Sequence, residues 1–475
     1  MRGFFIQWST HHTSSSHQIE MALHPAGCGP QQRGDFVNSS VQTVEQSAIR
    51  KVSWRLVPFV ALMFFINFLD RTAISFAGPN GMSKDLALSA AQFGMAAGIF
   101  FVGYIVLEIP SNLALHKYGA RRWLSRIMVS WGVVALLFTW VSNVEGLYTL
   151  RFLLGVAEAG FFPGAILFLS QWVPARYRSH ILGLFYLAQP LTTVIGAPLA
   201  ALLIEAHGLF GLAGWRIMFF GVAVPAIVVG FIAWFYLADK PSDARWLSAE
   251  EQRWLTDELA QEARQKAKTP GAHPGLALRD SRVWLFSLVY FGFIYGLYAL
   301  AFFLPTVIGG FEAQFGSKFN VFQKGLITAI PYLPAAVALY LATQHATRHG
   351  VSRWHVGLPA FIGAASIPCA LYMQSPVTTV AVITVTACAI FAALPNFWSL
   401  PARFLSGAGA ATGLALINTV GNLAGFAAPF ITGALKDSSG GYQLPMFVVG
   451  ALMALAGVLV LKVAHAPMPR AAALA

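Results

Sequence analysis

The sequence predicts an all-α membrane protein of 12 transmembrane helices in two pseudo-symmetric six-helix bundles, with both termini cytoplasmic. Three observations support this fold: the composition, a series of long apolar segments and an internal repeat. Of the 475 residues, 57% are hydrophobic and 11% are charged. Because a soluble domain has about 25% charged residues, we expect this chain to fold in a lipid bilayer.

Twelve apolar segments are long enough to cross a bilayer, since a hydrocarbon core of about 30 Å takes about 20 helical residues. Continuous apolar runs of this length indicate helices, whereas the strands of a barrel would alternate between apolar and polar residues. The expected spans are residues 56–78, 91–115, 123–142, 147–169, 180–204, 215–237, 283–304, 322–343, 354–373, 377–398, 407–435 and 445–465.

The basic residues lie mostly on one side of these spans. The odd-numbered connections hold five of the 31 Lys and Arg residues, namely Lys84, Arg216, Lys318, Lys324 and Lys436. Arg71 and Arg151 lie inside spans, and all the others lie on the side of the termini. By the positive-inside rule this side is cytoplasmic. The asymmetry also accounts for the net charge of +12 without a nucleic-acid partner.

The polar segments define the expected domain boundaries. We expect a disordered cytoplasmic tail (1–50), a first bundle (51–238), a cytoplasmic linker (239–281), a second bundle (282–466) and a short cytoplasmic tail (467–475). The linker contains an amphipathic helix, which opens with Ser248 and Glu251 in the spacing of a capping box. Translation from Met21 instead of Met1 remains an open alternative. The three scattered cysteines predict neither a disulfide framework nor a metal site.

The two bundles are related by an internal repeat. "KYGARRW" at 117–123 matches "RHGVSRW" at 348–354, and "PARYRS" at 174–179 resembles "PARFLS" at 401–406. The Ala-Pro pair at 197–198 returns at 428–429. Three matches in the same order, at equivalent places, indicate a parallel repeat of six helices about an axis along the membrane normal. In proteins of this type the substrate site lies near the midplane, between the halves.

Asp, Glu, Lys and Arg residues occur in the interior of the spans only in the first bundle. They are Asp70, Arg71, Glu108, Arg151 and Glu158. Each such charge costs roughly 2.5–3.5 kcal/mol at the centre of a membrane helix on insertion scales, so a functional reason is expected. In the second half, the positions equivalent to Asp70 and Arg71 are Ala301 and Phe302. Ionic chemistry is therefore expected in the first half alone.

Four of these charges are predicted to lie in one layer of the membrane. At 1.5 Å per residue, Asp70 and Arg71 lie about 11 Å from the outer end of span 1, and Arg151 and Glu158 lie about 6 and 16 Å down span 4. Residues seven apart share a helical face, so Arg151 is expected to pair with Glu158. One interpretation is a set of salt bridges that lock span 1 to span 4. We favour a proton site, in which Asp70 and Glu158 take protons and Arg71 meets an anion.

Polar and aromatic residues at mid-depth are further candidates for substrate binding. They are Tyr104, Gln189, Trp398, Asn418 and Asn422. The alternative for the amides is hydrogen bonding between membrane helices, worth about 1 kcal/mol each. The amides suit a hydroxylated acid, whereas the aromatic residues suit an aromatic acid or a sugar face. With Arg71 as the one uncommitted cation, a monoanion is favoured over a dianion.

Three stretches carry a family resemblance: "FLDRTAISFA" (68–77), "GYIVLEIPSNLALHKYGARRW" (103–123) and "RFLLGVAEAGFFPG" (151–164). Together they resemble the anion:cation symporter family of the major facilitator superfamily, which contains bacterial tartrate, phthalate, hydroxyphenylacetate and hexonate permeases and, more distantly, sialin and the vesicular glutamate transporters. The resemblance implies that Asp70 and Glu158 carry protons and that Arg71 binds substrate.

The loop after span 2 departs from the general superfamily pattern. Asn112 and His116 stand where Gly and Asp would be expected, as in the bacterial permeases of this family. The resemblance implies that the usual inner gate is replaced by Glu108 or Asn112 near Arg121.

The expected function is proton-coupled symport of a small organic anion by alternating access. We expect a monomer in the lipid of a bacterial cytoplasmic (inner) membrane, driven by the proton gradient without a cofactor or metal. The chain has no GxxxxGK[ST] loop for ATP. It also has no nucleophile and base pair, so an enzyme is not expected. An uncoupled facilitator and a transporter-like sensor of organic acids remain as alternatives.

Overall fold

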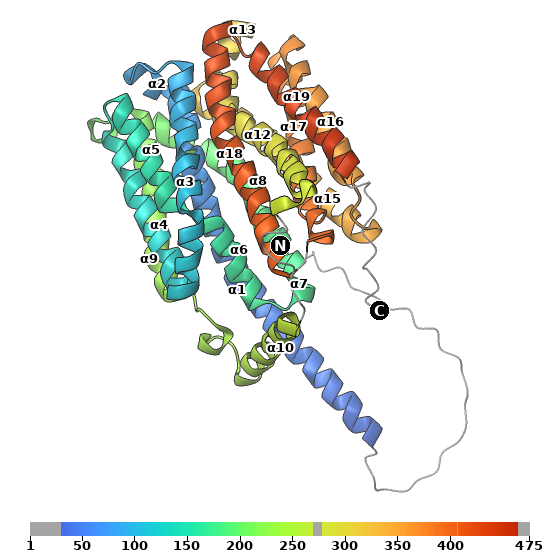
Figure 1. Cartoon of the computed structure of the whole chain (residues 1–475). Helices are drawn as coiled ribbons and strands as arrows, with labels where there is room; N and C mark the ends of the chain where they lie inside the picture. The colour runs from blue at the N-terminus through green and yellow to red at the C-terminus, as the bar shows by residue number, and fades with distance from the viewer. Residues whose placement is uncertain (1–29, 269–277, 406, 464–475) are drawn as a thin grey trace, which may run out of the picture.

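The computed structural model describes residues 30–268, 278–405 and 407–463, and this part of the chain is helical without a strand (Figure 1). Twelve of its helices or helix pairs are long and apolar enough to cross a membrane. The predicted all-α fold with 12 spans is thus confirmed. The predictions for residues 1–29 and 464–475 lie outside the described part.

The first bundle contains six spans, two of them formed by a single helix and four by consecutive helical segments. Its helices are α1 (Pro30–Ala77), α2 (Met82–Asp85), α3 (Ala90–Tyr118), α4 (Ala120–Leu137), α5 (Val144–Glu158), α6 (Phe161–Trp172), α7 (Ala175–Tyr186), α8 (Ala188–Glu205) and α9 (Gly214–Tyr236). The pairs α5–α6 and α7–α8 form spans 4 and 5, and a short 3-10 turn extends α4.

The second bundle repeats this arrangement after the linker helix α10 (Ala249–Lys268). Its helices are α12 (Ser281–Gly309), α13 (Phe311–Phe315), α14 (Val321–Ala329), α15 (Tyr332–His349), α16 (Trp354–Cys369), α17 (Pro376–Phe397), α18 (Gly407–Ser439) and α19 (Gln443–Val463). We call the end of the molecule with α10 the near end, and the opposite end with α2 and α13 the far end (Figure 1). The prediction that the near end is cytoplasmic stays a prediction.

The two bundles are packed tightly together toward the far end, where α3 lies against α18. A Cβ atom added to Gly94 would lie 2.1 Å from the carbonyl oxygen of Pro429, and one added to Gly433 would lie 2.1 Å from that of Ala90. The Asp437 carboxylate of α18 accepts hydrogen bonds of 3.1 and 2.7 Å from the first two backbone N–H groups of α3. These donors have no partner within their own helix, so Asp437 caps α3 across the interface.

The N-terminal part of α1 differs from the expected tail. We expected disorder up to residue 50, but the helix begins at Pro30 and continues without a break into span 1. For residues 45–49 the physical reason is contact with the rest of the near end: Ala48 and Ile49 are buried, and Glu45 and Ser47 bind residues of α7 and α10.

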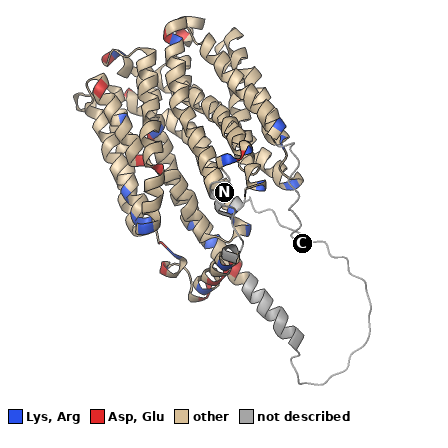
Figure 2. Cartoon of the chain, in the orientation of Figure 1, with Lys and Arg blue, Asp and Glu red and all other residues tan. Residues whose placement is uncertain are grey.

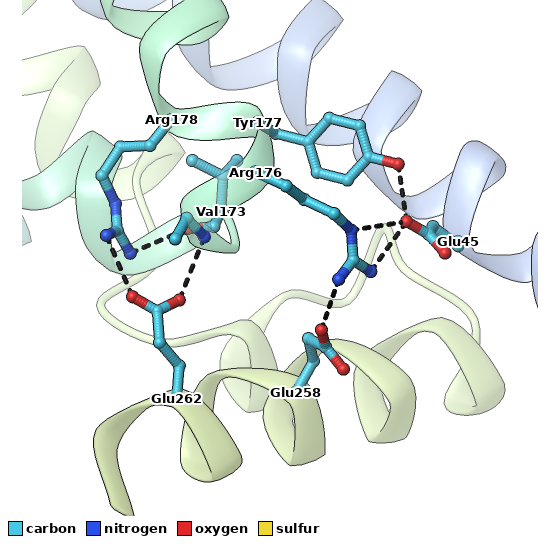
Figure 3. Close-up of polar contacts among 8 residues, drawn as sticks. Glu45, Val173, Arg176, Tyr177, Arg178, Glu258 and Glu262 are labelled. Carbon is cyan, nitrogen blue, oxygen red and sulfur yellow. Dashed lines mark hydrogen bonds and ion pairs between the residues drawn. The ribbon is translucent and has the colours of Figure 1, made fainter. Parts of the chain in front are cut away.

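A network of ion pairs joins three helices at the near end (Figure 3). Its members are Glu45 of α1, Arg176, Tyr177 and Arg178 of α7, and Glu258 and Glu262 of α10. Arg176 donates to Glu45 at 2.8 Å and to Glu258 at 2.6 Å, so one guanidinium holds both helices. We call this cluster the near-end network. All three helices belong to the first bundle or to the linker, so α10 is anchored to the first bundle.

The start of α10 has the predicted capping box. The Glu251 backbone N–H donates to Ser248 Oγ at 3.2 Å, and the Ser248 N–H donates to the Glu251 carboxylate at 2.8 Å. Glu251 also accepts from Ser47 at 2.7 Å and from Lys51 at 2.8 Å. Burial alone would raise the pKa of Glu251, but the hydrogen bonds from Lys51, the Ser248 N–H and Ser47 hold it below its ordinary value.

Candidate functional site

Charged side chains gather at the two ends of the described structure, and a few lie within the first bundle (Figure 2). The ionisable residues predicted inside the spans are Asp70, Arg71, Glu108, Arg151 and Glu158, and each is at most 7% exposed. Charges this deeply buried need partners, because their desolvation costs several kcal/mol each. The partners of each residue define what the site can do.

Arg71 is bound on three sides. Its Nε donates to Glu158 Oε1 at 2.9 Å, and its Nη2 forms an ion pair with the same oxygen. Its Nη1 donates to the hydroxyl of Tyr298 in the second bundle at 3.1 Å. The rings of Phe100 and Tyr104 lie 5.0 and 5.2 Å from the guanidinium carbon, within cation–π range. The expectation that Arg71 is uncommitted is therefore wrong for this structure.

Arg151 does not pair with Glu158 as expected. Its guanidinium donates to the backbone carbonyls of Ala96 and Ala97 at 3.0 and 3.1 Å, and to that of Arg71 at 3.4 Å. Residues seven apart share a face but lie about 10.5 Å apart along the helix. The carbonyls of the neighbouring helices are closer, and each has a second lone pair to offer. Arg151 thus joins α5 to α3 and α1.

Among the described residues, the hydrogen-bond partner of Asp70 is an aromatic side chain. Trp131 Nε1 of α4 donates to Asp70 Oδ2 at 2.9 Å. The other carboxylate oxygen, Oδ1, is buried and has no hydrogen-bond partner in the described part of the chain. A buried carboxylate oxygen without a donor is costly in a medium of low dielectric constant. Protonation would remove most of this cost.

Glu158 lies at a break in span 4. Pro163 has no N–H and would clash with the carbonyl of residue 159 if the helix were continuous. The chain accordingly leaves the helix after Glu158 and turns at Gly160, with φ of 83°, before α6 begins at Phe161. A Cβ atom at Gly160 would also lie 2.5 Å from the Ser111 hydroxyl oxygen. Both the positive φ and this close approach therefore require glycine. The break places Glu158 at the C-terminal end of α5.

A central cavity of about 70 Å³ lies between the bundles. All six predicted substrate-binding residues line it: Arg71, Tyr104, Gln189, Trp398, Asn418 and Asn422. Most of the other lining residues are aromatic or aliphatic. Arg71 is the one lining residue with a charged side chain in the described part, whereas Asp70, Arg151 and Glu158 lie behind the wall. Arg71 therefore stands between the buried acids and the cavity.

The predicted gate contact between Glu108 or Asn112 and Arg121 is not formed. Arg121 faces Asp239, which accepts from its backbone N–H at 2.8 Å and lies 3.8 Å from its guanidinium. Asn112 donates to the backbone carbonyl of Glu108 at 2.9 Å. The Glu108 carboxylate instead accepts from Asn418 of the second bundle at 2.8 Å. Asp239 lies closer to Arg121 because the tight turn at Gly119 brings the two connections together.

Sequence reasoning missed several partners of the buried charges. Tyr298, Trp131 and Phe100 contact the buried charges but are not among the predicted site residues. Aromatic residues make up 13% of the chain, so their presence at mid-depth does not distinguish partners from packing. The aromatic partners can be identified only from the residues that lie next to Asp70 and Arg71 in space.

Two homologous six-helix bundles around a central cavity, with buried charges at its wall, define an integral membrane transporter. The chain belongs to the Major Facilitator Superfamily, whose family model matches residues 60–429. It is 43% identical to a protein of Agrobacterium vitis named "Putative tartrate transporter", over 89% of this chain and 92% of that protein. It is 36% identical to the inner membrane transport protein RhmT of Escherichia coli, over 81% of this chain and 88% of that protein.

The solved structures agree on the fold. A bacterial homologue of the human lysosomal transporter Spinster, in an inward-facing and unoccupied conformation, superposes with a TM-score of 0.68 over 87% of this chain and 97% of that one, at 17% identity. The protein is therefore a multi-pass transporter of the bacterial inner membrane and not an enzyme.

Proposed function

We propose that this protein takes up a small organic anion together with protons by alternating access. The observation that carries the proposal is the position of Arg71, which lines the cavity while its ion-pair partner Glu158 is fully buried behind it. The relative named as a tartrate transporter supports an organic acid as the substrate. In this proposal Arg71 binds the substrate carboxylate and also pairs with Glu158, the residue that takes a proton.

The charge balance of the spans favours protons as the coupling ions. The interior holds three acids and two bases, so with all groups ionised it carries one net negative charge. An entering anion would raise the net negative charge from one to two. In a medium of low dielectric constant, like charges repel strongly. One or two bound protons offset the added charge.

Competition for Arg71 links the two binding events. A substrate carboxylate can take the place of Glu158 as the partner of the guanidinium, since both offer the same pair of oxygens. Glu158 would then be left buried and unpaired, at a cost of about 3–5 kcal/mol, unless it binds a proton. Proton binding therefore favours substrate binding, and by linkage substrate binding favours the proton. Asp70, with its unpartnered oxygen, is the second proton site of the proposal.

Alternating access then exposes this cavity first to one side of the membrane and then to the other. The tight α3–α18 packing joins the two bundles at the far end in this structure. With the near end cytoplasmic, this conformation is the one that leads to release of the anion. Loss of the protons to the cytoplasm allows Glu158 to recapture Arg71 and expel the substrate.

The test is uptake of labelled organic acids, including tartrate, into proteoliposomes with and without an inward proton gradient. We expect Glu158→Gln and Asp70→Asn to lose gradient-driven accumulation while exchange of substrate across the membrane continues. Undiminished uphill uptake in both variants would contradict the proposal. Gradient-independent uptake by the wild type would indicate a facilitator, and binding without uptake would indicate a sensor.

A further inference from the structure

A second cavity lies at the far end, between the end of α1 and the start of α14. Its volume is about 220 Å³, against about 70 Å³ for the central cavity, and no described residue lines both. Its walls come from α1, the turn after it and α8 in the first bundle, and from α12 and α14 in the second. We call it the far-end cavity. Neither the proposed proton sites nor the predicted substrate-binding residues belong to it.

The far-end cavity lies beside a tight contact between the bundles. Glu205 at the end of α8 accepts a hydrogen bond of 2.9 Å from the Phe322 N–H at the start of α14. A Cβ atom added to Gly325 of α14 would lie 2.8 Å from the carbonyl oxygen of Ala197 in α8. The two helices therefore approach each other closely, and the cavity is the space that this contact leaves toward α1 and α12.

The far-end cavity has an apolar floor and a polar rim. Phe76 and Ile204 are 5 and 6% exposed, and Pro305 is buried as well, so these residues form the floor. Asn80 and Lys324 line the cavity and are partly exposed, so they form the rim. A ligand that enters from the far end can bury an apolar body against the floor and keep a polar group at the rim.

Lys324 gives the rim a positive charge. It is the one charged residue among the described residues that line the cavity. None of the ion pairs between described residues includes it. The acid of the neighbouring helix end, Glu205, is engaged with the start of α14. The Thr306 hydroxyl lines the same cavity and can donate a further hydrogen bond. An ammonium group above an apolar floor suits an anion with an apolar body.

We propose that the far-end cavity is a second ligand site, separate from the transport site, which binds small aromatic or branched-chain monocarboxylates. The ring or alkyl group lies on the floor, and the carboxylate accepts from Lys324 and Thr306. A cavity of about 150 Å³ holds benzene, so this larger cavity has room for a ring with one carboxylate. Dicarboxylates and polyols are disfavoured, because their other polar groups would lie unpaired against the floor.

A ligand at this site contacts both bundles. It therefore favours the conformation in which α8 and α14 are in contact, since their separation would divide the site. The bound monocarboxylate thus inhibits transport without competing for the central cavity. This consequence rests on the proposed function, because alternating access requires the far end to open. Binding itself does not depend on the proposed function.

The test of binding is protection of a cysteine in the cavity wall by benzoate. The purified full-length protein has serine at its three native cysteines and carries Gly309→Cys. Gly309 lines the cavity, and an added Cβ atom would meet only Pro79, at 3.8 Å. We expect saturating benzoate to slow labelling by N-ethylmaleimide at least about threefold. Benzamide, which has the same shape without the charge, should have little effect. Thr306→Cys provides a second position.

Charge variants identify the residue that holds the carboxylate. In Lys324→Gln, about tenfold more benzoate should be needed for the same protection. Lys318→Gln is the matched control, because Lys318 lies shortly before α14 and its side chain is 85% exposed. It should retain the wild-type protection. Gln314→Cys on α13 is exposed and does not line the cavity, so benzoate should leave its labelling rate unchanged.

Several outcomes would overturn the inference. They are equal protection by benzamide, unchanged protection in Lys324→Gln, and equal slowing at Gln314→Cys. Failure of benzoate to protect either cavity cysteine has the same consequence. So does a failure of the reagent to label both positions, because a ligand could then not reach the cavity.

The inhibitory consequence is tested in proteoliposomes with the labelled acid that the uptake screen identifies. Benzoate should lower the maximal rate of uptake in the wild type and in Lys318→Gln, and about tenfold more should be needed in Lys324→Gln. Inhibition that disappears at saturating substrate would overturn this consequence, since benzoate would then compete in the central cavity. Uptake that ignores the proton gradient would contradict the proposed function and leave the labelling result intact.

Discussion

A guanidinium inside a membrane needs a partner for each donor that it buries, and Arg71 finds its partners on three helices. Glu158 lies on α5, Tyr298 on α12, and the aromatic rings of Phe100 and Tyr104 on α3. The contact with Tyr298 crosses from the first bundle to the second. Any movement of the bundles therefore changes the environment of Arg71, which is the requirement for coupling a local charge to a global motion.

Replacing Trp131 by phenylalanine removes the one donor that Asp70 has in the described part of the chain. A hydrogen bond to a charged group is worth about 1.5–3 kcal/mol, so we expect a lower thermal midpoint in detergent for Trp131→Phe. Trp234→Phe is the control, since the Trp234 side chain on α9 is 42% exposed. Equal midpoints for the two variants would contradict this account of Asp70.

Substitution of Tyr298 in the second bundle removes one of the contacts of Arg71 and leaves the others in place. Tyr298→Phe keeps the ring that stacks on Phe302 and removes the acceptor of Arg71 Nη1. We expect weaker substrate affinity with gradient coupling retained, because the Glu158 pair is untouched. Arg71→Lys should instead abolish transport, since an ammonium group cannot reproduce two parallel donors to a carboxylate. Saturable uptake with normal kinetics in Arg71→Lys would refute the role proposed for this residue.

At this scale the sequence predicted which residues meet but not how they pair. A rise of 1.5 Å per residue gave the depth of each charge, and the six lining residues do surround one cavity. Depth does not give direction around a helix or the identity of the neighbouring helix. The pairing of Arg151 with Glu158 was wrong for this reason, and the contact of Glu108 with Asn418 could not be foreseen. The proton and substrate roles stay predictions.

Helix α18 is adapted to close contact with α3 along one side. Gly433 lies opposite the carbonyl of Ala90, and Gly425 lies against the ring of Phe101. Small residues at such positions let membrane helices approach and pack, which is how helices associate in lipid. This side of α18 is therefore a close-packed surface between the bundles.

A methyl group at Gly433 should separate the two helices. Its Cβ would lie 2.1 Å from a backbone oxygen, which cannot move aside as a side chain can. Overpacking of this kind costs about 1–3 kcal/mol, so Gly433→Ala should lower the thermal midpoint and the transport rate. Gly441→Ala is the control, because a Cβ atom there would meet nothing within 4 Å. Similar midpoints for both variants would argue against this contact.

The docking of α10 on α1 should depend on pH. The pKa of Glu251 is below its ordinary value in the folded protein. Its contribution to docking is therefore fully present above the ordinary value of about 4.3 and is lost as the pH falls through the folded value. We expect a fluorophore at Gln261→Cys, in a chain without native cysteines, to gain mobility below about pH 4. Glu251→Gln should show greater mobility already at pH 7.

The elements were largely predictable, and the exception has a physical reason. Long apolar runs and the Ser248 capping box gave the spans and the start of α10. The extension of α1 before residue 50 was missed because its sequence is polar and has no apolar run. Its helix is held by specific contacts such as that of Glu45 with Arg176, which lies 131 residues away in the sequence. Interactions of that range leave no periodic pattern.

At the scale of the whole molecule, α3 and α18 hold the two bundles together at the far end, and Asp437 contributes to this contact. Its carboxylate belongs to the second bundle and caps the N-terminus of α3 in the first. An N-cap contact is worth about 0.5–2 kcal/mol, and an anion at a helix N-terminus is also favoured by the helix dipole. Opening of the far end must break this contact. The conformation adopted could not be predicted from sequence, because the same repeat serves every stage of the cycle.

Removing this cap should shift the population toward the far-end-open state. The assay is the rate at which a membrane-impermeant thiol reagent labels Leu297→Cys in the cavity wall. We expect Asp437→Ala to increase this labelling rate by roughly 2- to 30-fold. Asp85→Ala is the matched control, because Asp85 is also at the far end but pairs with Trp215 within the first bundle. An unchanged rate in Asp437→Ala would contradict this view of the closure.

Helix α1 carries Glu45 of the near-end network and Arg71, and Pro58 lies between these two residues. The proline removes one internal hydrogen bond, so the helix bends more easily there than elsewhere. From Pro58 to Arg71 is about 20 Å, so a swing of about 10° moves Arg71 by about 3.5 Å. That displacement is slightly larger than the 3.1 Å distance between Arg71 Nη1 and the Tyr298 hydroxyl. The segment of α1 before Pro58 can thus stay anchored at the near end. A small swing of the segment that carries Arg71 then makes or breaks the contact with Tyr298 between the bundles.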